Sequence, residues 1–183
     1  MQNLDFTDQI EFVEPKEEEP VHDTKKYFFY ETMLGKIGIA ERSGAVTDIF
    51  FASQTPPPVG TEEETFIIKE AYRQLDEYLH KRRKDFKLPV FMEGTEFQMK
   101  VWREITKIPY GKTKTYAEIA EAVGSRMAAR AVGQTANKNP IAIVIPCHRV
   151  IGESGKLIGY AAGLNFKSML LDIEGCKYKE GWH

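Results

Sequence analysis

The residue best suited to covalent chemistry in this chain is Cys147, which His148 and Arg149 follow directly. A cysteine reacts as its thiolate, and nearby cations or a helix N-terminus promote its ionisation. His148 is a candidate base for the thiol proton, directly or through a water, and a third group should orient that base. The residues alone leave this group open, with Glu174 one candidate among several. The alternative for either cysteine is a small buried hydrophobe, which we favour for Cys176 and find weaker for Cys147.

The first half of the chain has the pattern of an antiparallel sheet with one helix. Apolar and aromatic runs at residues 27–32, 36–40 and 46–51 are separated by glycine-containing turns, which is typical of a strand meander. Apolar residues at helical spacing follow, and Thr61 is predicted to cap this helix, with three glutamates in its first turn. A short strand is expected within residues 86–91.

The second half is predicted to be mainly helical. The expected helices cover residues 97–108, 116–123, 127–137 and 164–174. The second and third fit a loose helix-turn-helix pattern, although any tight helical hairpin gives the same pattern and pattern alone favours the hairpin. An apolar run at residues 141–145 leads into Pro146 and Cys147. The fold class that follows is α+β, in two halves.

Charge is distributed unevenly along the 183 residues. Residues 1–24 carry a net charge of −7 and residues 94–183 a net charge of +5, within a total of −2. We predict an acidic, flexible tail (residues 1–25), an α/β domain (26–93) and a helical domain (94–183). The basic half suits a polyanionic partner. A solvated tail without function is favoured over one that masks the basic half.

Composition excludes several classes of protein. Two cysteines cannot form a disulfide framework or a cysteine-rich structural zinc site. The chain has no run of eighteen apolar residues, so we expect no membrane span, and its acidic start lacks the pattern of a secretory signal. We therefore predict a cytoplasmic protein.

The sequence around Cys147 closely resembles the active-site sequence of the O6-alkylguanine-DNA alkyltransferase family. It reads NPIAIVIPCHRVIG over residues 139–152. Further matches in the family's order and spacing lie at residues 97–98, 101–102, 108–111, 115–116, 128–133, 159–160 and 163–164. The resemblance implies an N-terminal antiparallel β-sheet with a helix, in a ribonuclease H-like layout. It also implies a winged helix-turn-helix-like C-terminal domain that carries the cysteine.

The same resemblance implies a reaction and its catalytic residues. The family transfers an alkyl group irreversibly, once per protein molecule, from O6 of guanine in double-stranded DNA to its own cysteine, and O4-alkylthymine is a further candidate substrate. Cys147 would be the nucleophile, His148 the water-linked base and Glu174 the acid that orients it. Tyr116 would assist base rotation and donate a proton to the leaving guanine. Asn139 would be the hinge between the recognition helix and the active-site loop.

Binding residues are implied in the same way. The substrate pocket would include Tyr160, Val150, Trp102 and Lys167. The family docks its helix-turn-helix in the minor groove, where Arg130 would fill the gap left by the flipped base. The other expected DNA contacts are Tyr116, Ala128, Ala129, Gln98 and Ser125.

No cofactor is expected, and the protein is predicted to act as a monomer. Some family members carry a zinc site built from two cysteines and two histidines in the N-terminal half. This chain has no cysteine before Cys147, so we expect no metal. Two other functions stay open: a damage-sensing DNA-binding module without transfer, and a hydrolase that uses Cys147 and His148.

Overall fold

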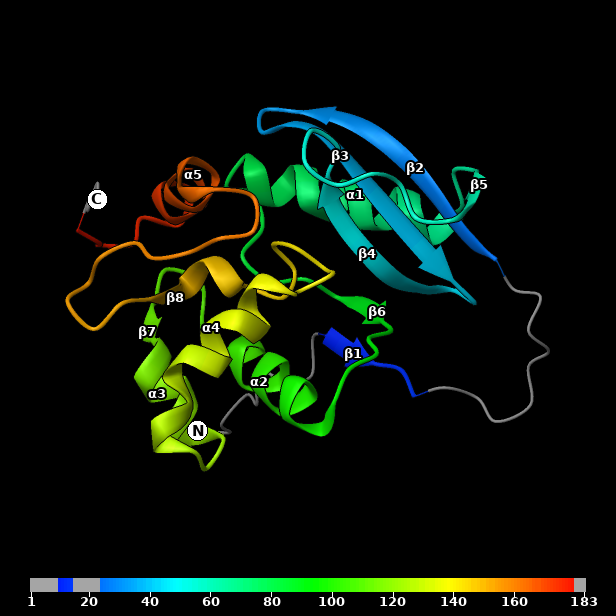
Figure 1. The fold of residues 1–183 in the computed structure, drawn as a ribbon. Helices are drawn as coiled ribbons and strands as arrows, with labels where there is room; N and C mark the ends of the chain where they lie inside the picture. The colour runs from blue at the N-terminus through cyan, green and yellow to red at the C-terminus, as the bar shows by residue number, and fades with distance from the viewer. Residues whose placement is uncertain (1–9, 15–23, 180–183) are drawn as a thin grey trace, which may run out of the picture. The chain divides into compact units, whose positions relative to one another are not determined.

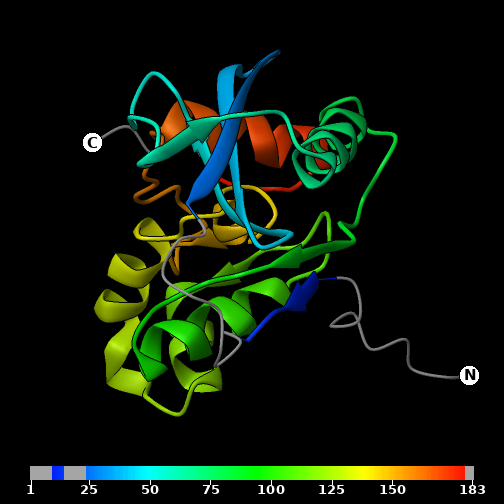
Figure 2. The same cartoon turned by 90° about the vertical axis from the view of Figure 1, so that its right-hand side faces the viewer.

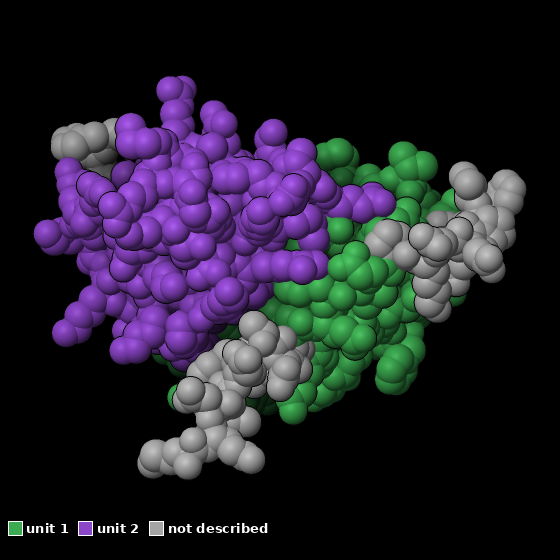
Figure 3. Space-filling view, turned by 90° about the horizontal axis from the view of Figure 1, so that it is seen from below, with its two compact units in different colours: residues 1–92 green, residues 93–183 purple. Residues whose placement is uncertain are grey.

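The computed structural model describes residues 10–14 and 24–179. The chain divides into two compact units, Met1–Met92 and Glu93–His183, which Figure 3 shows in different colours. Within the described residues, no helix has the length and apolar character needed to cross a bilayer.

The first unit is built on a mixed sheet. Its strands are β1 (Ile10–Phe12), β2 (Lys25–Thr32), β3 (Gly35–Arg42), β4 (Ala45–Phe51), β5 (Gly60–Glu62) and β6 (Leu88–Val90), in the order β1-β6-β4-β3-β2-β5. The predicted antiparallel meander is confirmed for β2, β3 and β4. The prediction is wrong for the outer pairings, because β6 runs parallel to both β4 and β1, and β5 runs parallel to β2. The helix that connects β4 to β6 makes such a parallel return possible.

Helix α1 (Phe66–Leu79) lies along one face of this sheet (Figures 1 and 2). Its buried stripe includes Ala71, Leu75 and Tyr78, at the helical spacing that the sequence predicted, while Ile68 is buried in place of the expected Ile67. The predicted cap is wrong: Thr65 caps the helix, and its hydroxyl accepts a hydrogen bond from the Ile68 amide. Thr61 instead pairs with β2 as part of β5, so the glutamates after it precede the helix.

The predicted tail is partly ordered. Ile10–Phe12 forms β1, whose residues pair in parallel with Leu88–Val90. The amide of Val13 also donates to the carbonyl of Val90, at 2.8 Å. The prediction of a flexible segment over residues 1–25 is therefore wrong for these residues, and residues 1–9 and 15–23 lie outside the described part.

The second unit is mainly helical, as predicted. Its longer elements are α2 (Glu96–Thr106), α3 (Tyr116–Ala122), α4 (Ala129–Asn137) and α5 (Leu164–Glu174). Two short 3₁₀ turns, Arg126–Ala128 and Cys147–Arg149, precede α4 and the strand β8 (Val150–Ile151) respectively. Strand β8 pairs with β7 (Lys114–Thr115), directly before α3. This pairing holds the end of the Cys147 turn beside the start of α3, and so beside Tyr116.

Candidate active site

Cys147 is buried at the start of its 3₁₀ turn, and the side chain of Asn139 bridges the loop that precedes this turn. Cys147 is 4% exposed, and its amide donates to the carbonyl of Ile145 at 2.8 Å. The Asn139 side chain donates to that same carbonyl at 2.8 Å and accepts from the amide of Ile141 at 3.0 Å. Asn139 therefore fixes both sides of the loop that presents the thiol.

The loop also contains a strained backbone position. Ile143 is 1% exposed and has a φ of +71°, in a region that β-branched residues rarely adopt. The amide of Val144 donates to the carbonyl of Ala142 at 2.8 Å, which closes a γ-turn around Ile143. Such strain costs on the order of 1–3 kcal/mol, and it persists only where the surrounding packing enforces it.

Burial raises the pKa of the Cys147 thiol to about 12. A hydrogen bond with Asn139 and the charge of Lys167 oppose this effect but do not overcome it. The positive charge of Lys167 favours the thiolate, as expected of a nearby cation, but burial outweighs it. Arg149, the adjacent cation, is bound elsewhere. With its pKa raised in this way, Cys147 carries its proton at neutral pH.

His148 is fully buried and contacts Glu174. The imidazole Nε2 lies 2.8 Å from Oε1 of Glu174, and neither side chain is exposed. Burial lowers the pKa of His148, while the carboxylate opposes that shift. With Nε2 donating to Glu174, Nδ1 is the ring nitrogen suited to accept a proton. Glu174, one of the acids that the sequence left open, is thus in contact with His148.

Arg149 clamps the same carboxylate. Its Nε lies 2.9 Å from Oε2 of Glu174, its Nη2 lies 2.8 Å from Oε1, and its Nη1 donates to the carbonyl of Ile108 at 2.6 Å. The amide of Gly111 adds a further donor to Oε2, at 3.0 Å. Burial would raise the pKa of Glu174, but its contacts with His148 and Arg149 hold it well below the usual range. Sequence reasoning gave Arg149 no such role, although its position next to His148 was a usable signal.

Lys167, from α5, is fully buried and joins three segments. Its Nζ donates to the carbonyls of Val150 at 2.6 Å, Ile158 at 2.9 Å and Gly159 at 3.2 Å, and to the hydroxyl of Tyr116 at 3.3 Å. The Tyr116 hydroxyl itself donates to Ile158, at 2.7 Å. Burial lowers the pKa of Lys167 to about 8 and raises that of Tyr116 to about 12. The structure thus brings together Lys167, Tyr116 and Val150.

The other two pocket candidates have different surroundings. Burial raises the pKa of Tyr160, and the charge that Cys147 would carry as a thiolate raises it further. Trp102 is 2% exposed, and its indole Nε1 donates to the carbonyl of Thr135 at 3.1 Å. The structure therefore places Trp102 in the packing of α2 against α4.

The candidate DNA contacts lie mostly around the start of α4. Arg130 is exposed, while Ser125, Ala128 and Ala129 are half-buried. In the described ranges, no hydrogen bond or ion pair involves the Arg130 guanidinium. Gln98 lies elsewhere, at the start of α2, where it forms a capping box with Thr95. A capping box explains Gln98 without any ligand.

Two family models match this chain. The DNA-binding domain of 6-O-methylguanine DNA methyltransferase matches residues 96–176, and the ribonuclease-like domain of the same family matches residues 25–91. Together they span both compact units.

Relatives with known names and structures agree. A methylated-DNA–protein-cysteine methyltransferase of Methanosarcina acetivorans is 44% identical, over 81% of this chain and 97% of the relative. The constitutive enzyme of that name from Bacillus subtilis is also 44% identical, over 84% and 98%. The crystal structure of Mycobacterium tuberculosis OGT in complex with DNA has a TM-score of 0.77 and 39% identity, over 81% of this chain and 92% of that one. This chain therefore belongs to the 6-O-methylguanine DNA methyltransferase family.

Proposed function

We propose that this protein repairs DNA by moving an alkyl group from O6 of guanine to Sγ of Cys147, irreversibly and once per molecule. The observation that carries the proposal is the buried turn at Cys147. In this turn His148 and Arg149 contact the carboxylate of Glu174, and the side chain of Asn139 bonds to the preceding loop. This arrangement fixes one thiol and one base in a site shielded from water. It suits a single displacement at carbon.

The chemistry needs one bond exchange and one proton transfer. Sγ of Cys147 forms a bond to the alkyl carbon as the bond from that carbon to O6 breaks. The thiol proton passes to Nδ1 of His148, directly or through a water, and the guanine that leaves ends with one proton in place of the alkyl group. Glu174 stabilises the imidazolium formed on the way. Tyr116 is a candidate for handing the proton to guanine.

Duplex DNA has to open for this reaction. The Cys147 thiol is buried, so a stacked guanine cannot reach it, and the damaged nucleotide must rotate out of the helix at a cost of about a few kcal/mol. Arg130 is exposed, and in this proposal it enters the minor groove and occupies the vacated position, where its planar guanidinium can stack on bases. The small side chains of Ala128 and Ala129 would allow close approach. One copy of the protein is enough for this reaction, because all the residues that the proposal uses belong to one chain.

Intact-mass measurement tests the proposal. The protein is incubated with duplex containing O6-methylguanine, with O4-methylthymine, or with neither. We expect a single methyl-sized increase with the first duplex, mapped to Cys147. Cys147→Ser should abolish the increase, whereas Cys176→Ser, the matched control, should keep it.

The same experiment separates the alternatives. Binding to the damaged duplex without any gain in mass would overturn alkyl transfer in favour of a damage-sensing module. Repeated turnover of small esters that depends on Cys147, again without a gain in mass, would overturn it in favour of a hydrolase.

A further inference from the structure

Met127 is an unusually exposed apolar residue. The residue is 97% exposed, compared with 53% for Ile158 and 41% for Met169 in the same unit, although Val59 of the first unit reaches 96%. Isolated exposed apolar residues are normal on protein surfaces. Exposure alone therefore assigns Met127 no role, and a role has to be inferred from where Met127 lies in the fold.

That position is the connection between α3 and α4. Met127 is the central residue of the 3₁₀ turn Arg126–Ala128, which leads directly into α4. Residues three apart in a 3₁₀ or α-helical turn lie on the same side. Met127 and Arg130 are so related, and only Ala128 and Ala129 separate them. In Figure 1 this connection lies at the end of α3 away from β7.

The surroundings of Met127 are basic and small rather than apolar. Arg126 is exposed and pairs with Glu121 of α3, Arg130 is exposed, and the first turn of α4 contains no acidic residue. A protein-binding patch would need further apolar side chains beside the methionine. A phosphate backbone is attracted by cations, and small residues let it come close. The charge and shape around Met127 therefore fit a nucleic acid.

We propose that Met127 is an apolar contact with duplex DNA, packing into the minor groove beside Arg130. The inference rests on the proposed function, which makes duplex DNA the ligand of this surface. Proteins that bind the minor groove often insert apolar side chains, methionine among them, against or between base steps. Because Met127 is uncharged, it adds affinity without adding to the dependence of binding on salt. Arg130 then enters the groove next to Met127, whose side chain already weakens the stacking of the neighbouring base pairs.

Binding to an undamaged fluorescent duplex, measured at several salt concentrations, tests this role. Met127→Gln is expected to weaken binding by about threefold to tenfold, since it removes a partly buried apolar contact. The slope of log affinity against log salt should not change. Met127→Leu should bind within about twofold of the wild type, because leucine retains the apolar volume. The matched control is Met33→Gln, which changes a 56% exposed methionine of the other unit and should have no effect.

Two further measurements keep the outcome unambiguous. Reaction with free O6-methylguanine base should be equal in Met127→Gln and the wild type, which shows an intact active site. Wild-type affinity for DNA in Met127→Gln, or a dimer in sedimentation that this substitution abolishes, would overturn the inference. In either case a methyl-sized gain in mass by the wild type would leave the proposed function standing. If the wild type gains no methyl group, the proposed function itself fails.

Discussion

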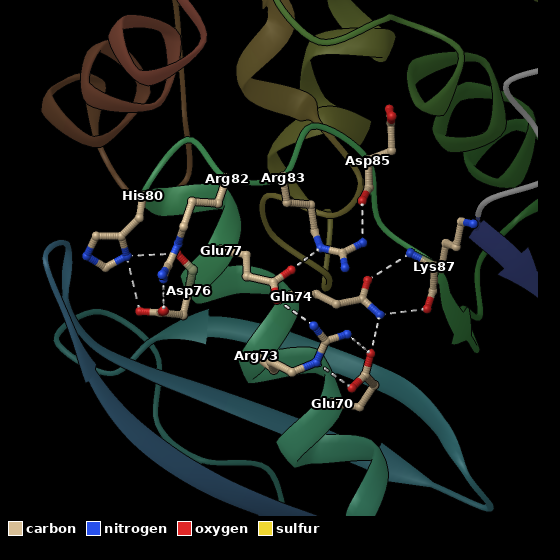
Figure 4. A network of polar contacts seen from close by, with 10 residues as sticks. All are labelled: Glu70, Arg73, Gln74, Asp76, Glu77, His80, Arg82, Arg83, Asp85 and Lys87. Atoms are coloured by element: carbon tan, nitrogen blue, oxygen red, sulfur yellow. Dashed lines mark hydrogen bonds and ion pairs between the residues drawn. The ribbon is translucent and has the colours of Figure 1, made fainter.

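Each unit contains a network of arginine and glutamate side chains, and the network is exposed to water in the first unit but buried in the second. On α1, in the first unit, arginines and carboxylates form a chain of ion pairs at the surface (Figure 4). Arg73 contacts both Glu70 and Glu77, and Arg83 contacts Glu77 as well. The Arg73 side chain is 53% exposed. In the second unit, Glu174 is gripped by His148 and Arg149, and its side chain is not exposed at all.

Burial decides what each network does. Water and salt compete with exposed ion pairs, which therefore contribute little to stability. A buried carboxylate has lost its hydration, so its partners must replace that hydration completely. The Glu174 network thus contributes less to net stability than to geometry, because it fixes the ring of His148 next to Cys147. Losing one partner leaves the others buried and uncompensated.

The largest expected effect comes from breaking the buried network. Glu174→Gln keeps the volume but removes the charge that Arg149 and His148 face. We expect a loss of about 3–5 kcal/mol in the free energy of unfolding, measured by urea titration. We also expect methyl transfer to slow by about 100-fold or more, measured in single-turnover assays. Glu77→Gln is the matched control on α1, and it should leave the transfer rate unchanged. Equal effects of the two substitutions would show that burial does not distinguish the networks.

The stability of the fold at acidic pH should also depend on the buried network around Glu174. The folded protein holds the pKa of Glu174 well below its usual range, so at moderately acidic pH the unfolded chain binds the proton more readily. Stability from this group is therefore fully present above the ordinary glutamate pKa of about 4.3, and it is lost as pH falls below that value. Melting temperatures from pH 7 to pH 3 should drop more steeply for the wild type than for Glu174→Gln. Parallel curves would contradict the assignment.

Features set by local sequence could be predicted. The last helix has the predicted bounds, 164–174, because Gly175 ends it in a left-handed conformation. The meander and the helices of the second unit follow from apolar spacing and turn residues in the same way. The role expected of Cys147 came from the resemblance, since pattern alone left that role open.

Features set by distant contacts could not be predicted. The strands β1 and β5 are each three residues long, and they become strands only by parallel pairing with β6 and β2. The pKa of Cys147 depends on how completely the surrounding segments cover it, which no local pattern encodes. The grip of Arg149 on Glu174 joins residues 25 positions apart. Ile143 has a positive φ, although β-branched residues rarely adopt one, so its residue type predicts the opposite.

A smaller effect should separate backbone strain from packing in the active-site loop. Ile143→Ala and Ile143→Gly both remove the buried side chain, and they differ only by one methyl group. In ordinary strand or helix conformations, alanine is the more stable of the two by about 0.5–1 kcal/mol. At a φ of +71° the order should reverse, and the glycine variant should be more stable, by about 1 kcal/mol. Urea titration of the two variants measures this difference, and an alanine variant at least as stable as the glycine variant would show that the turn is unstrained.

The smallest effect should come from the exposed network. Arg73→Gln removes the residue that contacts two glutamates of α1, yet the helix keeps its cap at Thr65 and its buried stripe of Ile68, Leu75 and Tyr78. The side chains of Glu70 and Glu77 are 28% and 27% exposed, so water can hydrate the carboxylates that Arg73 leaves, and no charge is stranded as it would be around Glu174. The melting temperature should therefore show no resolvable change at moderate salt, and the rate of methyl transfer should equal that of the wild type. A loss of stability as large as that of Ile143→Ala would mean that the surface network supports the packing of α1, and that exposure is a poor guide to what an ion pair contributes in this protein.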